Sequence, residues 1–379
     1  MHDVAIIGAG AIGLACALRL AQRDLRVLVV EREANADGAA SRAAAGMLSA
    51  QLERHASEAM AALCFSSRER HWRLLGDLEA LTGIDIDHRE LGALRVAFDE
   101  EEEQDLDSLA SEQRSRGWQV ERLSPTEARL LEPMLGTIRS AAWFPGERVL
   151  DPPRFVEALR RACDRLGVVR QEGAEVARVR ARGDRIDGLD LTNGERIVAG
   201  EVVIAGGAWS ASIEGTGVEG QVRPIRGQML ELRHTAVPQR ILDSRNAYLS
   251  PRSDGRVLVG STLEDVGFER AVTAGAAERL LAAAVKLAPD LARASLARHW
   301  CGFRAATRDL LPLLGRTSTG AIAATGHHRN GILLSALTAD VVAALVTGSD
   351  PEVSLEPFRP DRETSSSQRL DATEGSPAR

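Results

Sequence analysis

The stretch VAIIGAGAIGLACALRLAQRDLRVLVVE, residues 4–31, carries the pattern that decides the fold. Residues 4–7 are apolar and mostly β-branched, as in a parallel strand that is buried on both faces. A glycine-rich loop follows, then a helical segment at 14–23 and a second apolar strand at 26–31. This order predicts a strand–helix–strand unit, and therefore a Rossmann-like domain.

The three glycines of the loop have the spacing of a dinucleotide-binding motif. Gly8, Gly10 and Gly13 form G-x-G-x-x-G, with Ala11 and Ile12 between the last two. The first glycine permits a tight turn, the second lets the backbone approach a pyrophosphate, and the third lets helix and strand pack closely. The helix N-terminus then points at the phosphates. The alternative is a glycine-rich turn without a ligand, but strand, loop and helix follow one another in register.

The end of the second strand narrows the choice of dinucleotide. Glu31 stands where an acid binds a ribose 2′-hydroxyl and disfavours a 2′-phosphate, so NADP is not expected. The stretch DGAASRAAAGMLSA, residues 37–50, then supplies many small side chains. A backbone that lies against a flat ring system needs such residues, which favours FAD over NAD. The alternative is a small-residue helix packed in the core.

Composition excludes several other classes. The net charge of −7 gives no reason to expect nucleic acid or an anionic membrane as a partner. Lys286 is the only lysine, which leaves little room for Schiff-base or phosphate-loop lysine chemistry. The four cysteines lack Cys-x-x-Cys spacing, and no apolar run reaches membrane-spanning length. We therefore expect a soluble, cytoplasmic protein.

A chain of 379 residues exceeds one usual core, so two domains are expected. The predicted fold class is α/β and α+β, a Rossmann-like FAD-binding domain with an inserted antiparallel-sheet substrate domain. The FAD-binding domain is predicted to comprise residues 1–84, 151–222 and 300–360, and the substrate domain residues 85–150 and 223–299. Residues 361–379 are polar and charged, and are predicted to be a disordered tail.

Six motifs in order resemble those of the FAD-dependent amine and D-amino-acid oxidases, and most closely the glycine oxidase branch that is associated with making the thiamine thiazole. The resemblance extends to about residue 360. The motifs are IIGAGAIGL, SRAAAGMLSAQLE, VVIAGGAWS, VRPIRGQML, AYLSPRSDGRVLVGST and GHHRNGILLSALTA. The family implies noncovalent FAD, oxidation of an amine to an imine, and reduction of oxygen to hydrogen peroxide.

The resemblance also implies which residues contact FAD. Glu31 would hold the adenosine ribose, and the backbone at Val176 would face the adenine. Two further segments would lie along the flavin: Ala45, Gly46 and Met47, and the turn Arg329, Asn330, Gly331 and Ile332. The remaining positions implied to bind the cofactor are Arg32, Ser41, Arg42, Ala205, Gly206, Trp209 and Gly302.

The turn before Gly331 also has a physical argument of its own. Gly331 precedes a long helical pattern, so free backbone N–H groups and the positive end of the helix dipole could face the electron-rich edge of the flavin. Reduced flavin is anionic there, and such donors would raise its electron affinity. The alternative is an ordinary helix start after an Asn-Gly turn.

Two residues are candidates for binding the substrate carboxylate. A guanidinium presents two parallel donors to a carboxylate, and the resemblance gives this role to Arg304. It also places the hydroxyl of Tyr248, the only tyrosine, on the same carboxylate. Residues 305–309 depart from the family pattern, so a looser turn and an extra positive charge at Arg308 are expected. Arg329 and Met229 are candidates for the pocket wall.

The sequence leaves several functional readings open. The predicted function is oxidation of glycine, sarcosine or a short D-amino acid, with FAD and molecular oxygen. The alternatives are a sarcosine-oxidase-type enzyme with covalent flavin, for which Cys301 is near the expected position, a dehydrogenase with another electron acceptor, and a noncatalytic flavoprotein. The adjacent His327 and His328 diverge, so no metal is predicted. A homo-oligomer is implied by the resemblance only.

Overall fold

The computed structural model describes residues 2–34, 39–183 and 185–363. Its first large sheet has six strands in the order β18-β19-β12-β1-β2-β8. All neighbours in it are parallel except β18 and β19. The strands are β1 (His2–Ile7), β2 (Val27–Glu31), β8 (Val169–Glu172), β12 (Ala199–Ile204), β18 (Leu313–Arg316) and β19 (Ile322–Thr325).

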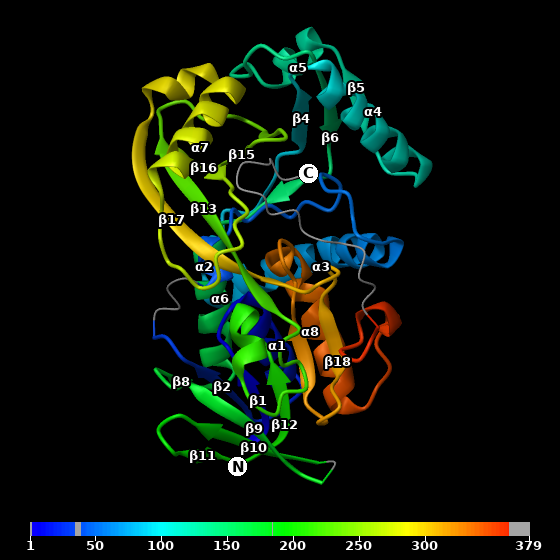
Figure 1. The fold of residues 1–379 in the computed structure, drawn as a ribbon, viewed down its shortest axis with the longest axis vertical. Coiled ribbons are helices and arrows are strands. Elements are labelled where there is room, and N and C mark those ends of the chain that lie inside the picture. The colour runs from blue at the N-terminus through cyan, green and yellow to red at the C-terminus, as the bar shows by residue number, and fades with distance from the viewer. Residues whose placement is uncertain (1, 35–38, 184, 364–379) are drawn as a thin grey trace.

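Both faces of this sheet are covered, which explains its nearly continuous apolar strands. In β1, Val4 and Ile6 face a layer of helices, while Ala5 and Ile7 face a three-stranded antiparallel sheet (Figure 1). The helices are α1 (Ala11–Ala21), α3 (Glu58–Thr82), α6 (Pro152–Arg165) and α8 (Gly331–Thr347), and the small sheet comprises β9 (Val176–Arg182), β10 (Arg185–Leu191) and β11 (Arg196–Ile197). The predicted strand–helix–strand unit is confirmed.

The second large sheet has eight strands in the order β17-β13-β16-β15-β14-β4-β6-β5. It is antiparallel, as predicted, except that β14 and β4 run parallel. Its strands are β4 (Ala93–Ala97), β5 (Glu121–Leu123), β6 (Ser140–Phe144), β13 (Arg223–Arg233), β14 (Ile241–Asp243), β15 (Tyr248–Pro251), β16 (Arg256–Gly260) and β17 (Ser295–Ala306). Strand β17 runs across residue 300, where the sequence places a domain boundary.

The alternation of side chains gives the eight-stranded sheet two different faces. Leu230, Leu249 and Val259 pack on one face with Leu280 and Leu287 of α7 (Ala274–Leu287). Their neighbours in sequence, such as Met229, Tyr248 and Leu258, form a separate cluster on the other face, together with Ala45. The second face therefore looks toward the Rossmann-like part, and a cavity lies between them.

The remaining elements are short or cover the edges of the two sheets. They are α2 (Ala40–Ala43), α4 (Glu100–Ser115), α5 (Pro125–Leu131), the strand pair β3 (Arg89–Glu90) and β7 (Arg148–Val149), and the 3-10 helices η1 (Gly207–Ser212), η2 (Pro289–Arg293) and η3 (Glu356–Phe358). No helix among the described residues is long and apolar enough to span a membrane.

Two expectations concern the chain after Arg304. The predicted tail lies outside the described residues from 364 onward. Within them, Arg362 pairs with Asp309 at 2.8 Å, and Thr307 donates to the same carboxylate at 3.0 Å. These bonds hold the turn after Arg304, and its looseness relative to the family pattern stays a prediction. Arg308 is exposed and does not line the cavity.

Candidate active site

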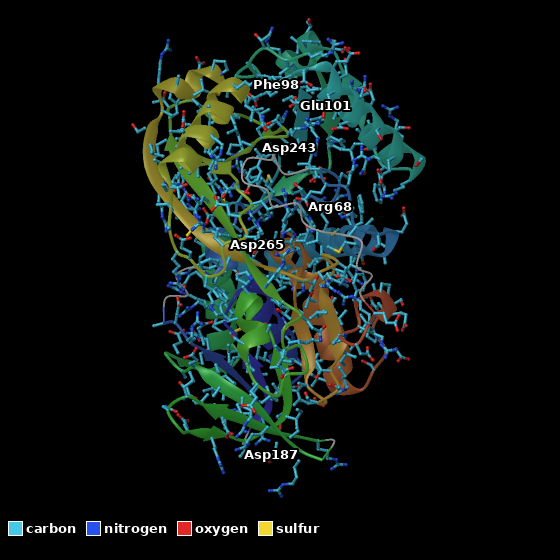
Figure 2. All side chains as sticks on the ribbon, viewed as in Figure 1. Arg68, Phe98, Glu101, Asp187, Asp243 and Asp265 are labelled. Atoms are coloured by element: carbon cyan, nitrogen blue, oxygen red, sulfur yellow. The ribbon has the colours of Figure 1, made fainter. Side chains whose placement is uncertain are left out.

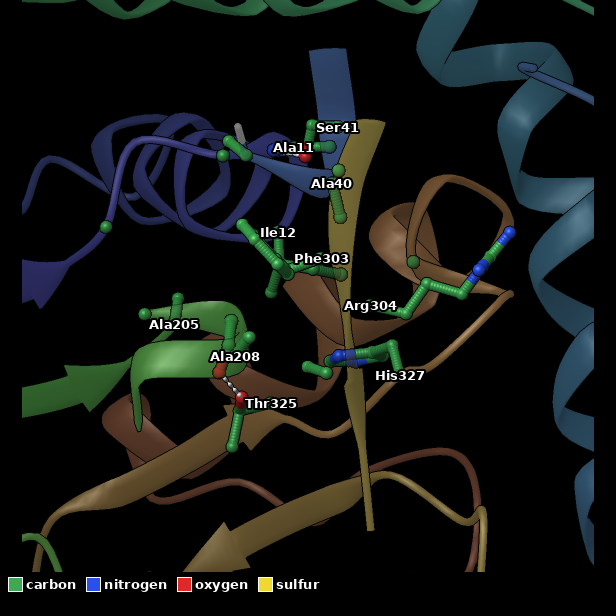
Figure 3. A pocket seen from close by; sticks show the side chains of 18 of the residues that line it. Ala11, Ile12, Ala40, Ser41, Ala205, Ala208, Phe303, Arg304, Thr325 and His327 are labelled. Carbon is green, nitrogen blue, oxygen red and sulfur yellow. Dashed lines mark hydrogen bonds between the residues drawn. The ribbon is translucent and has the colours of Figure 1, made fainter. Parts of the chain in front are cut away.

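The glycine motif forms the first end of the cavity. Gly8 has a φ of +103°, and a Cβ on it would lie 2.5 Å from the carbonyl oxygen of Ala205. A Cβ on Gly13 would lie 1.9 Å from the carbonyl oxygen of Gly8, so helix and strand approach as the motif predicts. The amide of Ala11, at the start of α1, donates to Ser41 Oγ at 2.9 Å (Figure 3).

Glu31 lies beside this motif. Its carboxylate accepts from the amides of Ala9 at 2.7 Å and Glu33 at 3.0 Å, and it lines the cavity. Arg32, next in sequence, lies over the ring of Trp209, with 4.5 Å from Cζ to the ring centroid. The carboxylate is therefore oriented by backbone donors and keeps lone pairs for a ligand hydroxyl.

The small-residue stretch is not a helix of the core. Helix α2 has only four residues, none of them buried, and Ala44 through Met47 are extended or bent. Two side chains hold this segment: Trp300 of β17 donates from Nε1 to the carbonyl of Ala43 at 3.2 Å, and Arg252, which follows β15, donates to the carbonyl of Ala45. A Cβ on Gly46 would lie 2.0 Å from the carbonyl oxygen of Leu150.

Helix α8 begins at Gly331, as the sequence predicts, and its capping residue Asn330 makes no side-chain hydrogen bond to it. Residues 329–332 line the cavity, so two helix N-termini, those of α1 and α8, open on the same space. His327 is buried and bonds to Thr338 at 3.0 Å, and the described residues contain no cluster that could hold a metal ion.

Met229 and Tyr248 line the cavity from the eight-stranded sheet, within a row of paired residues that crosses four strands. The register pairs Trp300 with Met229, Met229 with Gly260, and Gly260 with Tyr248. Tyr248 is 8 % exposed, and its hydroxyl has only the thioether of Met229 nearby, at 3.8 Å. A thioether is a weak acceptor, so the phenol has no strong partner among the described residues.

Arg304 stands on the same face, and its guanidinium points away from the end with Ala11 and Ser41 (Figure 3). It donates to the carbonyl of Thr262 at 3.0 Å and to Ser261 Oγ at 2.7 Å. Burial, and next the neighbouring Arg329, lower the pKa of Arg304 to about 10, so it stays cationic at neutral pH. Among the described residues no carboxylate forms an ion pair with it.

A half-buried cation without an anion beside it is a ready binding site for an anion. Arg329 differs, because its Nε pairs with Glu53 at 2.7 Å, and this carboxylate raises the pKa of Arg329. Sequence reasoning missed Glu53, Ser261 and Thr262. They lie far from their partners along the chain, although all three stand at the ends of motifs that the resemblance uses.

The cavity measures about 420 Å³. It brings together the residues predicted for cofactor and substrate with two exceptions, since Gly13 and Arg42 do not line it. A mostly apolar space that is lined by a dinucleotide motif and by a guanidinium without an ion-pair partner among the described residues is suited to a flavin dinucleotide and a small carboxylate. These features define a flavin-dependent oxidoreductase of two-sheet architecture.

Comparison with known proteins agrees with this class. The chain belongs to the FAD dependent oxidoreductase family, whose model matches residues 3–345. It is 37 % identical to the glycine oxidase of Geobacillus kaustophilus over 94 % of this chain and 96 % of that protein. The crystal structure of that enzyme superposes with a TM-score of 0.90, over 96 % of this chain and 99 % of that one.

Two further relatives broaden the comparison. The bifunctional protein ThiO/ThiG of Synechocystis is 35 % identical over 95 % of this chain, which spans only 54 % of that longer protein. The crystal structure of iminodiacetate oxidase from Chelativorans is 27 % identical, with a TM-score of 0.86, and covers 94 % of this chain and 98 % of that one. The protein is thus an FAD-dependent oxidoreductase similar to glycine oxidases.

Proposed function

We propose that the chain oxidises glycine, or a small relative such as sarcosine or a short D-amino acid, to an imine. Water hydrolyses the imine to the 2-oxo acid and releases the amine nitrogen, and oxygen is reduced to hydrogen peroxide. One observation carries the proposal: Arg304 is a half-buried cation that lines the same cavity as the dinucleotide motif and forms no ion pair with a carboxylate among the described residues. The similarity to glycine oxidases supports it.

In this proposal the chain's main tasks are charge recognition and orientation. Arg304 presents donors to the substrate carboxylate, and Tyr248 adds its hydroxyl, which has only the Met229 thioether beside it among the described residues. Once its carboxylate is fixed in this way, the substrate points its α-carbon toward the middle of the cavity. FAD, when bound, accepts the hydride of the α-carbon and passes the electrons to oxygen.

We propose the following residues as the cofactor site: Gly8, Gly10, Ala11, Ile12, Gly13, Glu31, Arg32, Ser41, Arg42, Ala45, Gly46, Met47, Val176, Ala205, Gly206, Trp209, Gly302, Arg329, Asn330, Gly331 and Ile332. Their arrangement around one cavity, apart from Gly13 and Arg42, supports this set. Gly13 acts from outside it, by allowing α1 to approach Gly8.

Noncovalent attachment of FAD is part of the proposal. Cys16, Cys64 and Cys163 are buried in the core, Cys301 is only partly exposed, and none of the four lines the cavity. The single lysine lies on α7, where its ammonium is 3.8 Å from the ring centroid of Phe98. Both observations weigh against the sarcosine-oxidase-type alternative.

The walls of the substrate end favour small side chains. Met229, Tyr248 and Ala45 pack with Met47 and Trp300 around it. A pocket distinguishes substrates that differ by one methylene by only about 1–3 kcal/mol in free energy. The proposal therefore covers glycine together with its nearest relatives. Arg329, paired with Glu53, would form the polar side of the wall.

The pathway, the domain division, the oligomeric state and the location of the protein are further parts of the proposal. We propose a link to thiazole formation for thiamine, supported by the similarity to the ThiO part of ThiO/ThiG proteins. The division into FAD-binding and substrate domains, a homo-oligomer and a cytoplasmic location stay predictions. Light scattering of the purified protein would give the oligomeric state directly.

The activity is tested by comparing glycine with methylamine, which is glycine without its carboxylate. We expect peroxide with glycine and none above background with methylamine. Equal turnover of both amines would contradict the role given to Arg304, and peroxide from neither would contradict the proposed substrate class.

A further inference from the structure

Arg252, which follows strand β15, is a guanidinium buried completely inside the protein, with 0 % of its surface exposed. Its Nη1 donates to Ser250 Oγ at 3.0 Å and to the carbonyl of Pro251 at 3.1 Å. Its Nη2 donates to the carbonyl of Ala45. The nearest acid is Asp151, 3.9 Å from Nε. A buried charge is costly, so its placement against one particular carbonyl calls for a function.

That carbonyl belongs to the segment that lines the cavity. Ala45, Gly46 and Met47 all contact the cavity. A trans peptide group is planar, with its N–H opposite its C=O. Because the carbonyl of Ala45 faces Arg252, the amide of Gly46 points the other way. The carbonyl of Gly46 likewise accepts from Leu150 at 2.9 Å, which turns the amide of Met47 away from β7.

Neither of these two amides donates to another described residue. Two neighbouring N–H groups without partners in a cavity wall form a donor pair for a ligand. A hydrogen bond from a cation to a carbonyl polarises the whole peptide group, and it does so more strongly where water is excluded. The guanidinium therefore makes the amide of Gly46 a stronger donor than an ordinary peptide.

We propose that Arg252 is a positioning residue that acts through the Ala45–Gly46 peptide. It directs the amide of Gly46 into the cavity, beside that of Met47, as a donor to FAD, and it favours the reduced, more electron-rich form of that cofactor. The inference rests on the FAD of the family and does not depend on which amine the enzyme oxidises.

The test is the midpoint potential of the bound flavin, measured with an enzymatic reductant and a reference dye, so that no amine substrate takes part. We expect Arg252→Met to bind reduced flavin at least tenfold more weakly relative to oxidised flavin, which lowers the two-electron potential by about 30 mV. The matched control is Arg256→Met, because Arg256 pairs with the same Asp151, at 2.5 Å, and does not touch Ala45.

An unchanged potential in Arg256→Met alongside the fall in Arg252→Met supports the inference. An equal fall in potential in both variants would overturn it, because the loss of either positive charge beside Asp151 would then explain the change. An unchanged potential in folded, FAD-containing Arg252→Met would also overturn it. If this variant does not accumulate with FAD, Arg252→Gln replaces it, with a fall expected and an unchanged potential again contradicting the inference.

Discussion

The guanidinium of Arg304 rests on a strand position where no side chain would fit. A Cβ on Gly227 would lie 2.3 Å from Arg304 Nη1 and 2.6 Å from Cζ. A Cβ on Gly260 would lie 2.2 Å from the hydroxyl oxygen of Tyr248. Neither glycine has a positive φ, so its role is clearance rather than backbone freedom. The two proposed substrate contacts thus lie flat on neighbouring strands.

Replacing Arg304 by alanine removes the proposed anchor. Loss of one partner from a buried ion pair costs about 2–5 kcal/mol, so we expect kcat/KM for glycine to fall roughly 10²-fold or more. FAD content, measured by flavin absorbance, should remain that of the wild type. Loss of FAD without a specific kinetic defect would contradict the assigned role.

Gly227→Ala tests the clearance. The added methyl group must displace the guanidinium, so we expect KM for glycine to rise about tenfold or more, while bound FAD is retained. Gly76→Ala is the control, because a Cβ at this exposed position of α3 meets nothing within 4 Å. Unchanged KM in Gly227→Ala would show that Arg304 does not need this strand position.

At the scale of elements, the sequence predicts best what is local. The β1–α1 turn and the start of α8 are read from glycines and apolar runs within a few residues. The partners of Arg304 could not be predicted, because Ser261 and Thr262 reach it only through strand pairing. Arg252 and Ala45 are 207 positions apart, and no local pattern joins them.

The segment 261–273 is a second element that the sequence does not reveal. It leaves the eight-stranded sheet and reaches the cofactor end, where Phe268 stacks on Trp209 with ring centroids 5.0 Å apart. Arg270 pairs there with Glu33 at 2.6 Å. Because Trp209 lines the cavity, this segment braces its wall.

Phe268→Ala should therefore weaken FAD binding. An aromatic pair contributes about 0.5–1.5 kcal/mol, so we expect the Kd for FAD to rise roughly 3–10-fold, measured by the recovery of free flavin fluorescence on dilution. Val266→Ala, in the same segment and partly exposed, should leave it unchanged. Equal effects of both substitutions would indicate general loosening of the segment.

At the scale of the molecule, buried charges join the two sheets. Glu147, in the turn between β6 and β7, is completely buried and accepts from the amide of Gln51 at 3.0 Å. Its nearest cation is Arg68, at 3.5 Å, in the middle of the molecule (Figure 2). Burial raises the pKa of Glu147 to about 7 and that of Asp243 to about 6.

A carboxyl with a raised pKa binds its proton more tightly in the folded state. Its contribution to stability is present below its unfolded pKa of 4.5 and is lost as the pH rises through about 7. We expect Glu147→Gln to gain stability relative to the wild type over this range, by about 3 kcal/mol in total. Denaturant unfolding at several pH values measures the difference, and a constant difference would contradict the raised pKa.

The proposed oxidase activity is tested by an anaerobic titration of the purified holoprotein with glycine, followed at the flavin absorbance maximum at about 450 nm. We expect glycine to bleach the flavin, and air to restore the colour and produce peroxide. A flavin that stays oxidised with glycine, sarcosine, D-alanine and D-proline would contradict the proposed activity.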